Sequence, residues 1–183
     1  MKTDPPKRPS LVCTIGHSTH PLEVFVGLLQ THQVQRVLDV RTIPRSRHNP
    51  QFNLDTLPAS LRLANMDYTH MPGLGGLRPT HAGSLNGAWR NTSFRGYADY
   101  MQTPEFSENV EIVVKLALQE RCVLMCAEAV PWRCHRSLIA DALTVRGVRV
   151  EDIMGDKERK LHVLTPWAQV AGLTITYPPE VNP

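Results

Sequence analysis

The chain contains 183 residues, of which 42% are hydrophobic and 20% are charged, and its formal net charge is +3. This length and composition are typical of one soluble globular domain with a hydrophobic core. The charge is too small to indicate a nucleic-acid binder by itself, and no apolar run approaches the roughly 20 residues needed to cross a membrane.

The first ten residues are polar and proline-rich, and they contain no apolar segment that would act as a signal peptide. We expect residues 1–10 to form a disordered tail and residues 11–183 to form a single α/β domain. The four cysteines lack the spacing of a disulfide framework, which favours free thiols in a reducing compartment. The sequence therefore predicts a cytoplasmic protein.

In the first part of the chain, short apolar runs alternate with segments of helical periodicity. The first apolar run stops at Gly16, and Ser18 or Thr19 is expected to cap the helix that follows. Asn53 is expected to cap a second helix, with Leu54, Leu57 and Leu61 on one stripe. In chain order we expect a strand at 11–15, a helix at 21–31, a strand at 36–40, a helix after Asn53 and a strand at 67–70.

The second part of the chain begins with an irregular loop at residues 77–93 and then returns to the same alternation. A proline at position 104 predicts a break in the long helix after the loop, and Gly147 is expected to stop a later helix. In chain order we expect a helix at 94–119 broken near Thr103-Pro104, a strand at 121–126, a helix at 134–146, a strand at 148–153, a helix start at Thr165-Pro166 and an edge strand at 173–177.

This alternation of strands with helices long enough to cross over predicts a three-layer α/β fold. We expect a mainly parallel sheet with helices on both faces. In such sheets ligands bind outside the carboxyl ends of the strands. The unusual residues of this chain follow strands, as that rule requires.

Two glycine-containing turns follow strands. After the first strand, Gly16 permits a tight exit, and His17 and Ser18 are placed where an anion would meet a helix N-terminus. Capping is the structural alternative for Ser18. After the third strand, Gly75 and Gly76 would let backbone N–H groups approach a ligand, although glycines serve ordinary turns equally well. The turn after the third strand does not match a phosphate-loop or dinucleotide fingerprint.

Basic residues gather after the second strand, in a half of the chain that has an excess of positive charge. Arg41 and Arg45 offer planar donor forks suited to phosphate or carboxylate, and Ser46 adds a hydroxyl. Asp39 lies within the strand, where an unpaired carboxylate is costly, so we expect it to pair with Arg41 or another cation. The cluster favours an anionic ligand.

The sharpest feature follows the most apolar strand. A thiol and a carboxylate come directly after it, and a second thiol, an imidazole and two guanidiniums open the next helix. A helix N-terminus with nearby cations lowers the pKa of a thiol and binds anions. The same setting stabilises a developing negative charge. The residues are Cys126-Ala127-Glu128 and Arg133-Cys134-His135-Arg136.

Two familiar kinds of cysteine site do not fit the spacing. Cys122 and Cys126 lie roughly 13 Å apart along a strand, too far to chelate one zinc ion together. Cys126, Cys134 and His135 can still meet, so a zinc site stays open as an alternative without support from spacing. A cysteine phosphatase would require an arginine where Trp132 stands. Inert buried thiols are the structural alternative for the cysteines.

At these residues the chain resembles the bacterial and archaeal family named for its domain of unknown function 488. The resemblance spans about residues 11–155 and implies an α/β cytoplasmic protein, but it supplies no reaction. The motifs that carry it are Thr14-Ile15-Gly16-His17-Ser18, Asp39-Val40-Arg41, Pro44-Arg45-Ser46, Leu74-Gly75-Gly76, Phe94, Tyr97, Met101, Cys126-Ala127-Glu128 and Cys134-His135-Arg136.

Our leading hypothesis is an enzyme, a hydrolase or transferase, that acts on a phosphate-bearing substrate such as a nucleotide or nucleic acid. Glu128 and His135 are the acid/base candidates, with Cys126 or Cys134 as a nucleophile. We expect no resident metal, and the sequence names no cofactor. The expected ligand-binding residues are Gly16, His17, Ser18, Arg41, Arg45, Ser46, Gly75, Gly76, Arg133 and Arg136.

Two further hypotheses stay open. One is a non-catalytic anion or nucleic-acid binding module, in which the arginines hold phosphates and aromatic side chains stack on bases. The other is a zinc-binding protein. The aromatic residues near the basic motifs are Trp89, Phe94, Tyr97 and Trp132, and helical spacing makes Phe94 and Tyr97 core candidates.

Overall fold

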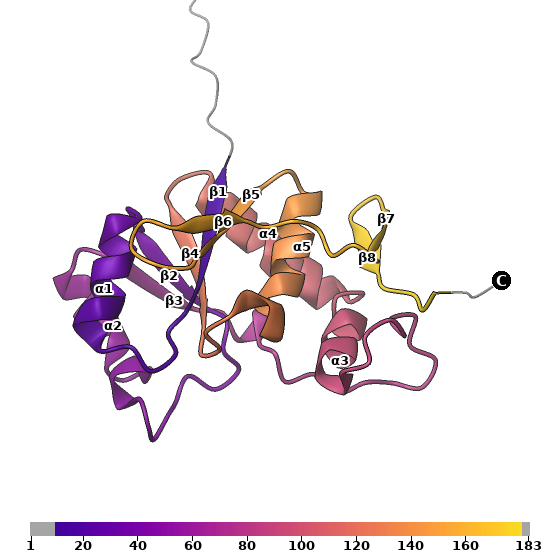
Figure 1. The fold of residues 1–183 in the computed structure, drawn as a ribbon, viewed down its shortest axis with the longest axis horizontal. Helices are drawn as coiled ribbons and strands as arrows, with labels where there is room; N and C mark the ends of the chain where they lie inside the picture. The colour runs from indigo at the N-terminus through magenta and orange to yellow at the C-terminus, as the bar shows by residue number, and fades with distance from the viewer. Residues whose placement is uncertain (1–9, 181–183) are drawn as a thin grey trace, which may run out of the picture.

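Six strands form the central sheet of the computed structural model, which describes residues 10–180 (Figure 1). The disordered tail expected at residues 1–10 therefore lies, apart from Ser10, outside the described residues. The sheet order is β3-β2-β4-β1-β5-β6, and only the β5–β6 pair is antiparallel. The strands are β1 (Leu11–Gly16), β2 (Arg36–Asp39), β3 (Asp67–His70), β4 (Cys122–Cys126), β5 (Arg149–Ile153) and β6 (Arg159–Leu161).

Helices cover both faces of this sheet, so the predicted three-layer α/β class is confirmed. Alternate strand residues point to opposite faces. Val12 and Leu124 join a core with α3 (Thr92–Tyr100), α4 (Pro104–Ala117) and α5 (Arg136–Val145). Cys13 and Val123 join the other core, with α1 (Leu22–Thr31) and α2 (Leu57–Leu63). Figure 1 shows the two helix groups on either side of the strands.

The expected caps of the first two helices are wrong. The N-cap of α1 is Pro21, without a side-chain cap, and Ser18 instead takes a left-handed conformation with φ 47° before the helix. After a short 3-10 turn at Pro50–Phe52, α2 begins only at Leu57. The reason is local, because the Asn53 side chain accepts a hydrogen bond from the Ser46 N–H at 2.6 Å and is not free to cap a helix.

The predicted break between α3 and α4 is confirmed. Thr103 caps α4 by accepting the Phe106 N–H, and Pro104 occupies the first helical position, where its missing N–H costs nothing. The stop of α5 at Gly147 is also confirmed, since this glycine has a φ of +76° that other residues rarely adopt. The irregular loop expected at residues 77–93 is present up to the start of α3.

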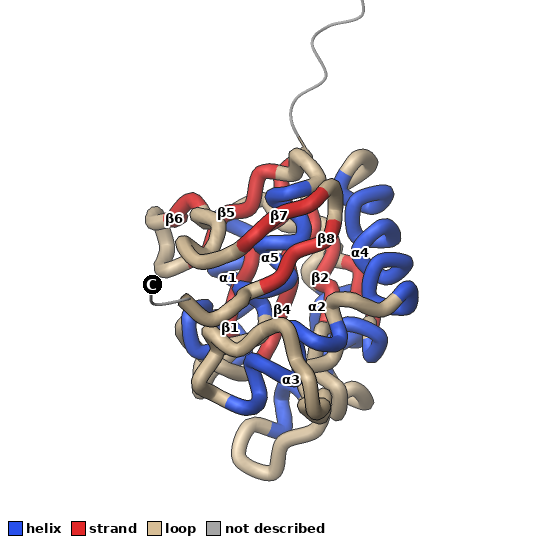
Figure 2. The backbone as a smooth tube through the Cα atoms, turned by 90° about the vertical axis from the view of Figure 1, so that its right-hand side faces the viewer, coloured by secondary structure: helices blue, strands red, loops and turns tan. Residues whose placement is uncertain are grey.

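The C-terminal part differs most from expectation. The helix predicted from Thr165-Pro166 is wrong, because these residues lead into a hairpin of β7 (Gln169–Ala171) and β8 (Thr174–Thr176). The strand predicted at 173–177 exists, but it pairs with β7 outside the main sheet. Figure 2 shows the hairpin beside α5. Buried Asp141 of α5 holds this segment by accepting hydrogen bonds from the Tyr177 hydroxyl at 2.8 Å and the His162 ring at 2.7 Å.

Among the described residues, no helix has the length and apolarity that crossing a membrane requires.

Candidate functional site

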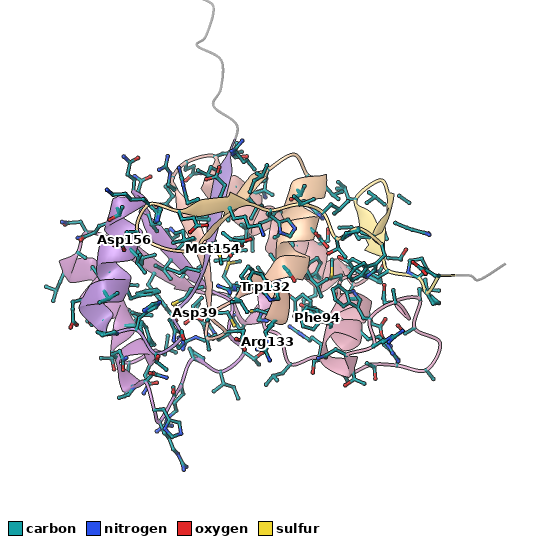
Figure 3. All side chains as sticks on the ribbon, viewed as in Figure 1. Asp39, Phe94, Trp132, Arg133, Met154 and Asp156 are labelled. Carbon is teal, nitrogen blue, oxygen red and sulfur yellow. The ribbon has the colours of Figure 1, made fainter. Side chains whose placement is uncertain are left out.

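A pocket of about 700 Å³ opens at the carboxyl ends of the parallel strands. Segments distant in sequence form its wall, including Arg133 and Phe94, both labelled in Figure 3. Three predicted residues, Gly16, Gly75 and Arg136, are not part of the lining. The predicted residues that line the pocket are His17, Ser18, Arg41, Arg45, Ser46, Gly76, Cys126, Glu128, Arg133, Cys134 and His135.

The predicted glycines bring backbone segments together. A Cβ on Gly16 would overlap the Glu128 carbonyl oxygen, and one on Gly76 would overlap the ring of His135. Gly75 likewise packs against the side chain of Thr42. These positions are glycine because neighbouring segments occupy the space of a side chain, and this packing fixes the shape of the pocket.

Two thiols and an imidazole meet at the floor of the pocket. Cys126 ends β4 and points to the α5 face, as the alternation of β4 requires. Because α5 covers that face, the residues that open it, Cys134 and His135, reach the same place. The two sulfur atoms and a ring nitrogen of His135 all lie within 4.8 Å of one another. Cys122 lies at the other end of β4, buried in the core and outside this cluster.

The two thiols have different acidities. The hydrogen bond from the Cys126 thiol, helped by the Arg136 guanidinium and backbone N–H, lowers the pKa of Cys134 to about 7 against the opposing effect of burial. The pKa of Cys126 is raised, first by that same hydrogen bond and then by burial. A sulfur at a helix N-terminus beside a cation is the usual setting of a reactive thiolate. Cys134 is therefore the thiol that ionises near neutral pH.

The imidazole of His135 is held in one tautomer. Its Nε2 lies 3.0 Å from the Val40 carbonyl oxygen, and a carbonyl only accepts, so this nitrogen carries the proton. The other nitrogen, Nδ1, is then a free acceptor 3.8 Å from the Cys134 sulfur. Burial lowers the pKa of His135, which keeps the ring neutral. Cys134 therefore has a neutral acceptor nitrogen beside its sulfur.

Arg136 places a buried positive charge beneath this cluster. The residue is 1% exposed, and its Nη2 donates to the Glu128 carbonyl at 2.8 Å, which ties the loop after β4 to α5. Its Nε and Nη1 are buried and have no hydrogen-bond partner in the described part of the chain. A buried charge needs compensation, and the Cys134 thiolate is the group placed to supply it.

Arg41 is engaged within the protein. Its Nε and Nη2 donate to the two carboxylate oxygens of Asp39 at 2.9 and 2.6 Å, which confirms the pairing expected for Asp39. Nη2 also donates to the Phe52 carbonyl at 2.7 Å. The Tyr68 hydroxyl also donates a hydrogen bond to the Asp39 carboxylate, at 2.7 Å. Arg41 lines the pocket, but most of its N–H donors already have partners within the protein. It therefore holds the pocket wall in place more than it offers a site for an anion.

His17 belongs to the same buried wall. Its ring stacks on Phe52 at 4.2 Å between ring centroids, and Nε2 lies 3.1 Å from Arg41 Nη1. Burial lowers the pKa of His17 to about 4, opposed by the hydrogen bond to the Ser18 carbonyl. The ring is therefore neutral at pH 7 and accepts from Arg41.

The exposed cations of the pocket are Arg45 and Arg133. Neither has an ion-pair partner within residues 10–180. Ser46 follows Arg45 in the loop after β2, and its Oγ accepts the Asn49 N–H at 3.0 Å. Glu128 is also exposed at this rim. The rim therefore has two free guanidiniums and one carboxylate above the thiol cluster.

Sequence reasoning named Phe94 near the basic motifs but missed the other apolar residues of the pocket, Ile43 and Leu77. Exposed Ile43 and Leu77, with half-buried Phe94, form a wall beside the cations. No periodicity signals Ile43 and Leu77, because both lie in loops. Of the other aromatic residues, Tyr97 is fully buried, as its helical spacing suggested, while Trp132 is 60% exposed.

Comparison with known proteins gives one match. A family model described as "Domain of unknown function DUF488" matches residues 21–143, a span that includes both cysteines of the cluster but not Gly16, His17 and Ser18. No curated protein and no solved structure matches the chain.

Proposed function

The chain belongs to the DUF488 family, whose description assigns no reaction, and from the site we propose that it is an enzyme that acts on a phosphate-bearing substrate through the Cys134 thiolate. A hydrolase or transferase fits this chemistry. The observation that carries the proposal is the Cys134 sulfur at the floor of the pocket, beside a buried Arg136 that forms no ion pair with a carboxylate of residues 10–180.

The residues around Cys134 supply the parts that nucleophilic catalysis needs. Cys134 attacks the electrophilic atom of the substrate, and the neutral His135 Nδ1 takes up the thiol proton whenever the thiol is protonated. Glu128 stands at the open rim, where it can exchange a proton with a leaving group or with attacking water. A structural thiol has no need of a bare imidazole nitrogen and an acidic side chain around it.

The exposed charge of the rim favours a phosphate-bearing substrate. Arg45 and Arg133 present donor forks that no carboxylate of residues 10–180 occupies. The N-terminus of α5 adds its partial positive charge at the floor of the pocket. An anionic group held between the rim and the floor would bring an adjoining bond within reach of Cys134. We also place the protein in the cytoplasm, where thiols stay reduced.

A panel of inorganic phosphate, phosphate monoesters, phosphodiesters and 5′-nucleotides, followed by ³¹P NMR, tests this proposal. We expect at least one compound to bind and to be converted, and conversion to stop in Cys134→Ser. Arg45→Ala and Arg133→Ala should weaken binding at least tenfold, while Arg47→Ala, an exposed arginine outside the pocket, should not. Glu128→Gln should slow conversion without loss of binding. If no compound of the panel binds, the proposal is wrong.

One observation favours a nucleic-acid module as the second candidate. Exposed Trp132 stands next to Arg133, and the Lys160 ammonium lies 6.0 Å from its ring centre. An exposed aromatic ring among cations is suited to stacking on an unpaired base. Oligonucleotide binding that is lost in Trp132→Ala and falls steeply with salt, without conversion of any phosphate compound, would favour this candidate over an enzyme.

A further inference from the structure

We propose that Cys126 and Cys134 form a reversible disulfide, which makes Cys134 a site of oxidation by hydroperoxides and Cys126 the thiol that resolves the oxidised form. This inference rests on the reactive Cys134 of the proposed function, and it adds a second chemistry to the same residue. Its basis is that two sulfur atoms from different segments lie within 4.8 Å of each other at the floor of one pocket.

The geometry selects this pair among the four cysteines. Cys126 and Cys134 have sulfur atoms within 4.8 Å, so a modest rotation brings them to bonding distance. Cys13 and Cys122 lie on adjacent strands, but they point into opposite cores and are fully buried. Cys13 and Cys122 therefore cannot pair with each other.

Access to the pair is limited to small molecules. Cys134 is only 4% exposed, although it lines the pocket, and Cys126 is partly buried beside it. Hydrogen peroxide is small enough to reach this floor, whereas a protein disulfide is not. A thiolate at a helix N-terminus beside a cation is the form that peroxides oxidise.

The chemistry balances in two steps. The Cys134 thiolate attacks one oxygen of hydrogen peroxide, so that the O–O bond breaks, a sulfenic acid forms and hydroxide leaves. The Cys126 thiol then attacks the sulfenic sulfur, which forms the S–S bond and releases the sulfenic oxygen as water. The Cys126 proton goes to that leaving oxygen, by way of the acceptor nitrogen of His135. The hydroxide of the first step takes up the proton that Cys134 released when it ionised. The two cysteines therefore lose two electrons together, and one peroxide is reduced to two waters.

Oxidation to the disulfide would abolish the reactivity of Cys134 reversibly and prevent its irreversible oxidation. The disulfide removes the nucleophile and the negative charge that compensates Arg136. It also stops oxidation at a stage that a small dithiol reverses, before the irreversible acids of a lone cysteine form. The hydrogen bond that ties the loop between the two cysteines to α5 runs from Arg136 to a backbone carbonyl and involves neither sulfur, so it is compatible with the disulfide.

Mass spectrometry of the full chain after treatment with hydrogen peroxide tests the inference. We expect the wild type to lose the mass of two hydrogen atoms, with a Cys126–Cys134 link in the peptide map, and to recover it with dithiothreitol. Cys126→Ser keeps a hydrogen-bond donor but no resolving thiol, so it should accumulate a dimedone-reactive sulfenic acid at Cys134 and then gain further oxygen. Cys122→Ser should behave as the wild type.

Three results would overturn the inference: oxygen gain at Cys134 in the wild type without a disulfide, a link that involves Cys13 or Cys122, or thiols that react only after a chelator removes a bound zinc ion. The last result would make the cluster a Cys₂His metal site instead. Disulfide formation in a protein that binds no phosphate compound would support this inference and refute the proposed function. Conversion of a phosphate compound that depends on Cys134, in a protein that forms no disulfide, would support the proposed function and refute this inference.

Discussion

Replacement of Cys126 by alanine should make Cys134 a weaker acid. In the wild type the thiol of Cys126 donates to the Cys134 sulfur, and this hydrogen bond is the main reason why the pKa of Cys134 is lowered from 9.0 to about 7. Alanine removes the donor and leaves Arg136 and the helix N-terminus in place. The pKa of Cys134 should therefore rise toward its ordinary value.

The size of the effect follows from the ionised fraction. With a pKa of about 7, half of Cys134 is thiolate at pH 7. If the whole shift were lost, only about 1% would be ionised at that pH, so the reaction rate with a thiolate reagent would fall by up to ~50-fold. Above about pH 10 the two proteins should react at similar rates, because Cys134 is then ionised in the wild type and in the variant.

Alkylation by iodoacetamide, with the modified peptide quantified by mass spectrometry at each pH, measures this directly. Cys126→Ser retains a donor and should stay near the wild-type profile, and Cys122→Ala is the matched control in the same strand. A midpoint near pH 9 in the wild-type plot of alkylation rate against pH would refute the account of how the Cys134 thiolate is stabilised. Identical plots for the wild type and Cys126→Ala would refute it as well.

Two further predictions concern the walls of the pocket. Asp39→Asn leaves the buried Arg41 charge without its partner and should lower the free energy of unfolding in urea by about 3–5 kcal/mol. The control Asp67→Asn removes an exposed pair with Arg36 and should cost under about 1 kcal/mol. Equal effects of the two substitutions would contradict the argument that burial makes the Asp39–Arg41 pair the more important one. Gly16→Ala drives a methyl group into the Glu128 carbonyl and should destabilise the fold by about 1–3 kcal/mol. The control Gly27→Ala, in the middle of α1 where there is space for a methyl group, should stabilise the fold by about 0.5–1 kcal/mol. A Gly16→Ala variant as stable as the wild type would show that the loop after β4 does not pack against β1.

Patterns that depend on neighbours in sequence could be predicted. The alternation of β4 and the strand-helix order place Cys126 and Cys134 at one edge of the sheet, and the proline at position 104 marks the break between α3 and α4. The pairing of Asp39 with Arg41 also follows from the cost of a buried carboxylate.

The remaining features depend on contacts between distant segments. The loop after β4 takes its path from Arg136, which binds the Glu128 carbonyl, and from the close approach of Gly16 to the same group. No local pattern reveals that Arg136 is buried while Arg133, three residues earlier, is exposed at the rim. The hairpin near the C-terminus is likewise fixed by the buried Asp141, which overrides the helix-start signal at residues 165–166.

Protection of Cys134 by inorganic phosphate tests the central claim most directly, because it links anion binding at the rim to the thiol at the floor. Phosphate should slow alkylation of Cys134 in a saturable way, and chloride at the same ionic strength should not. The double variant Arg45→Ala/Arg133→Ala should lose this protection while its alkylation rate without phosphate stays close to that of the wild type. An unchanged rate in the presence of phosphate, or equal protection in the double variant, would contradict the claim that this pocket receives a phosphate-bearing substrate.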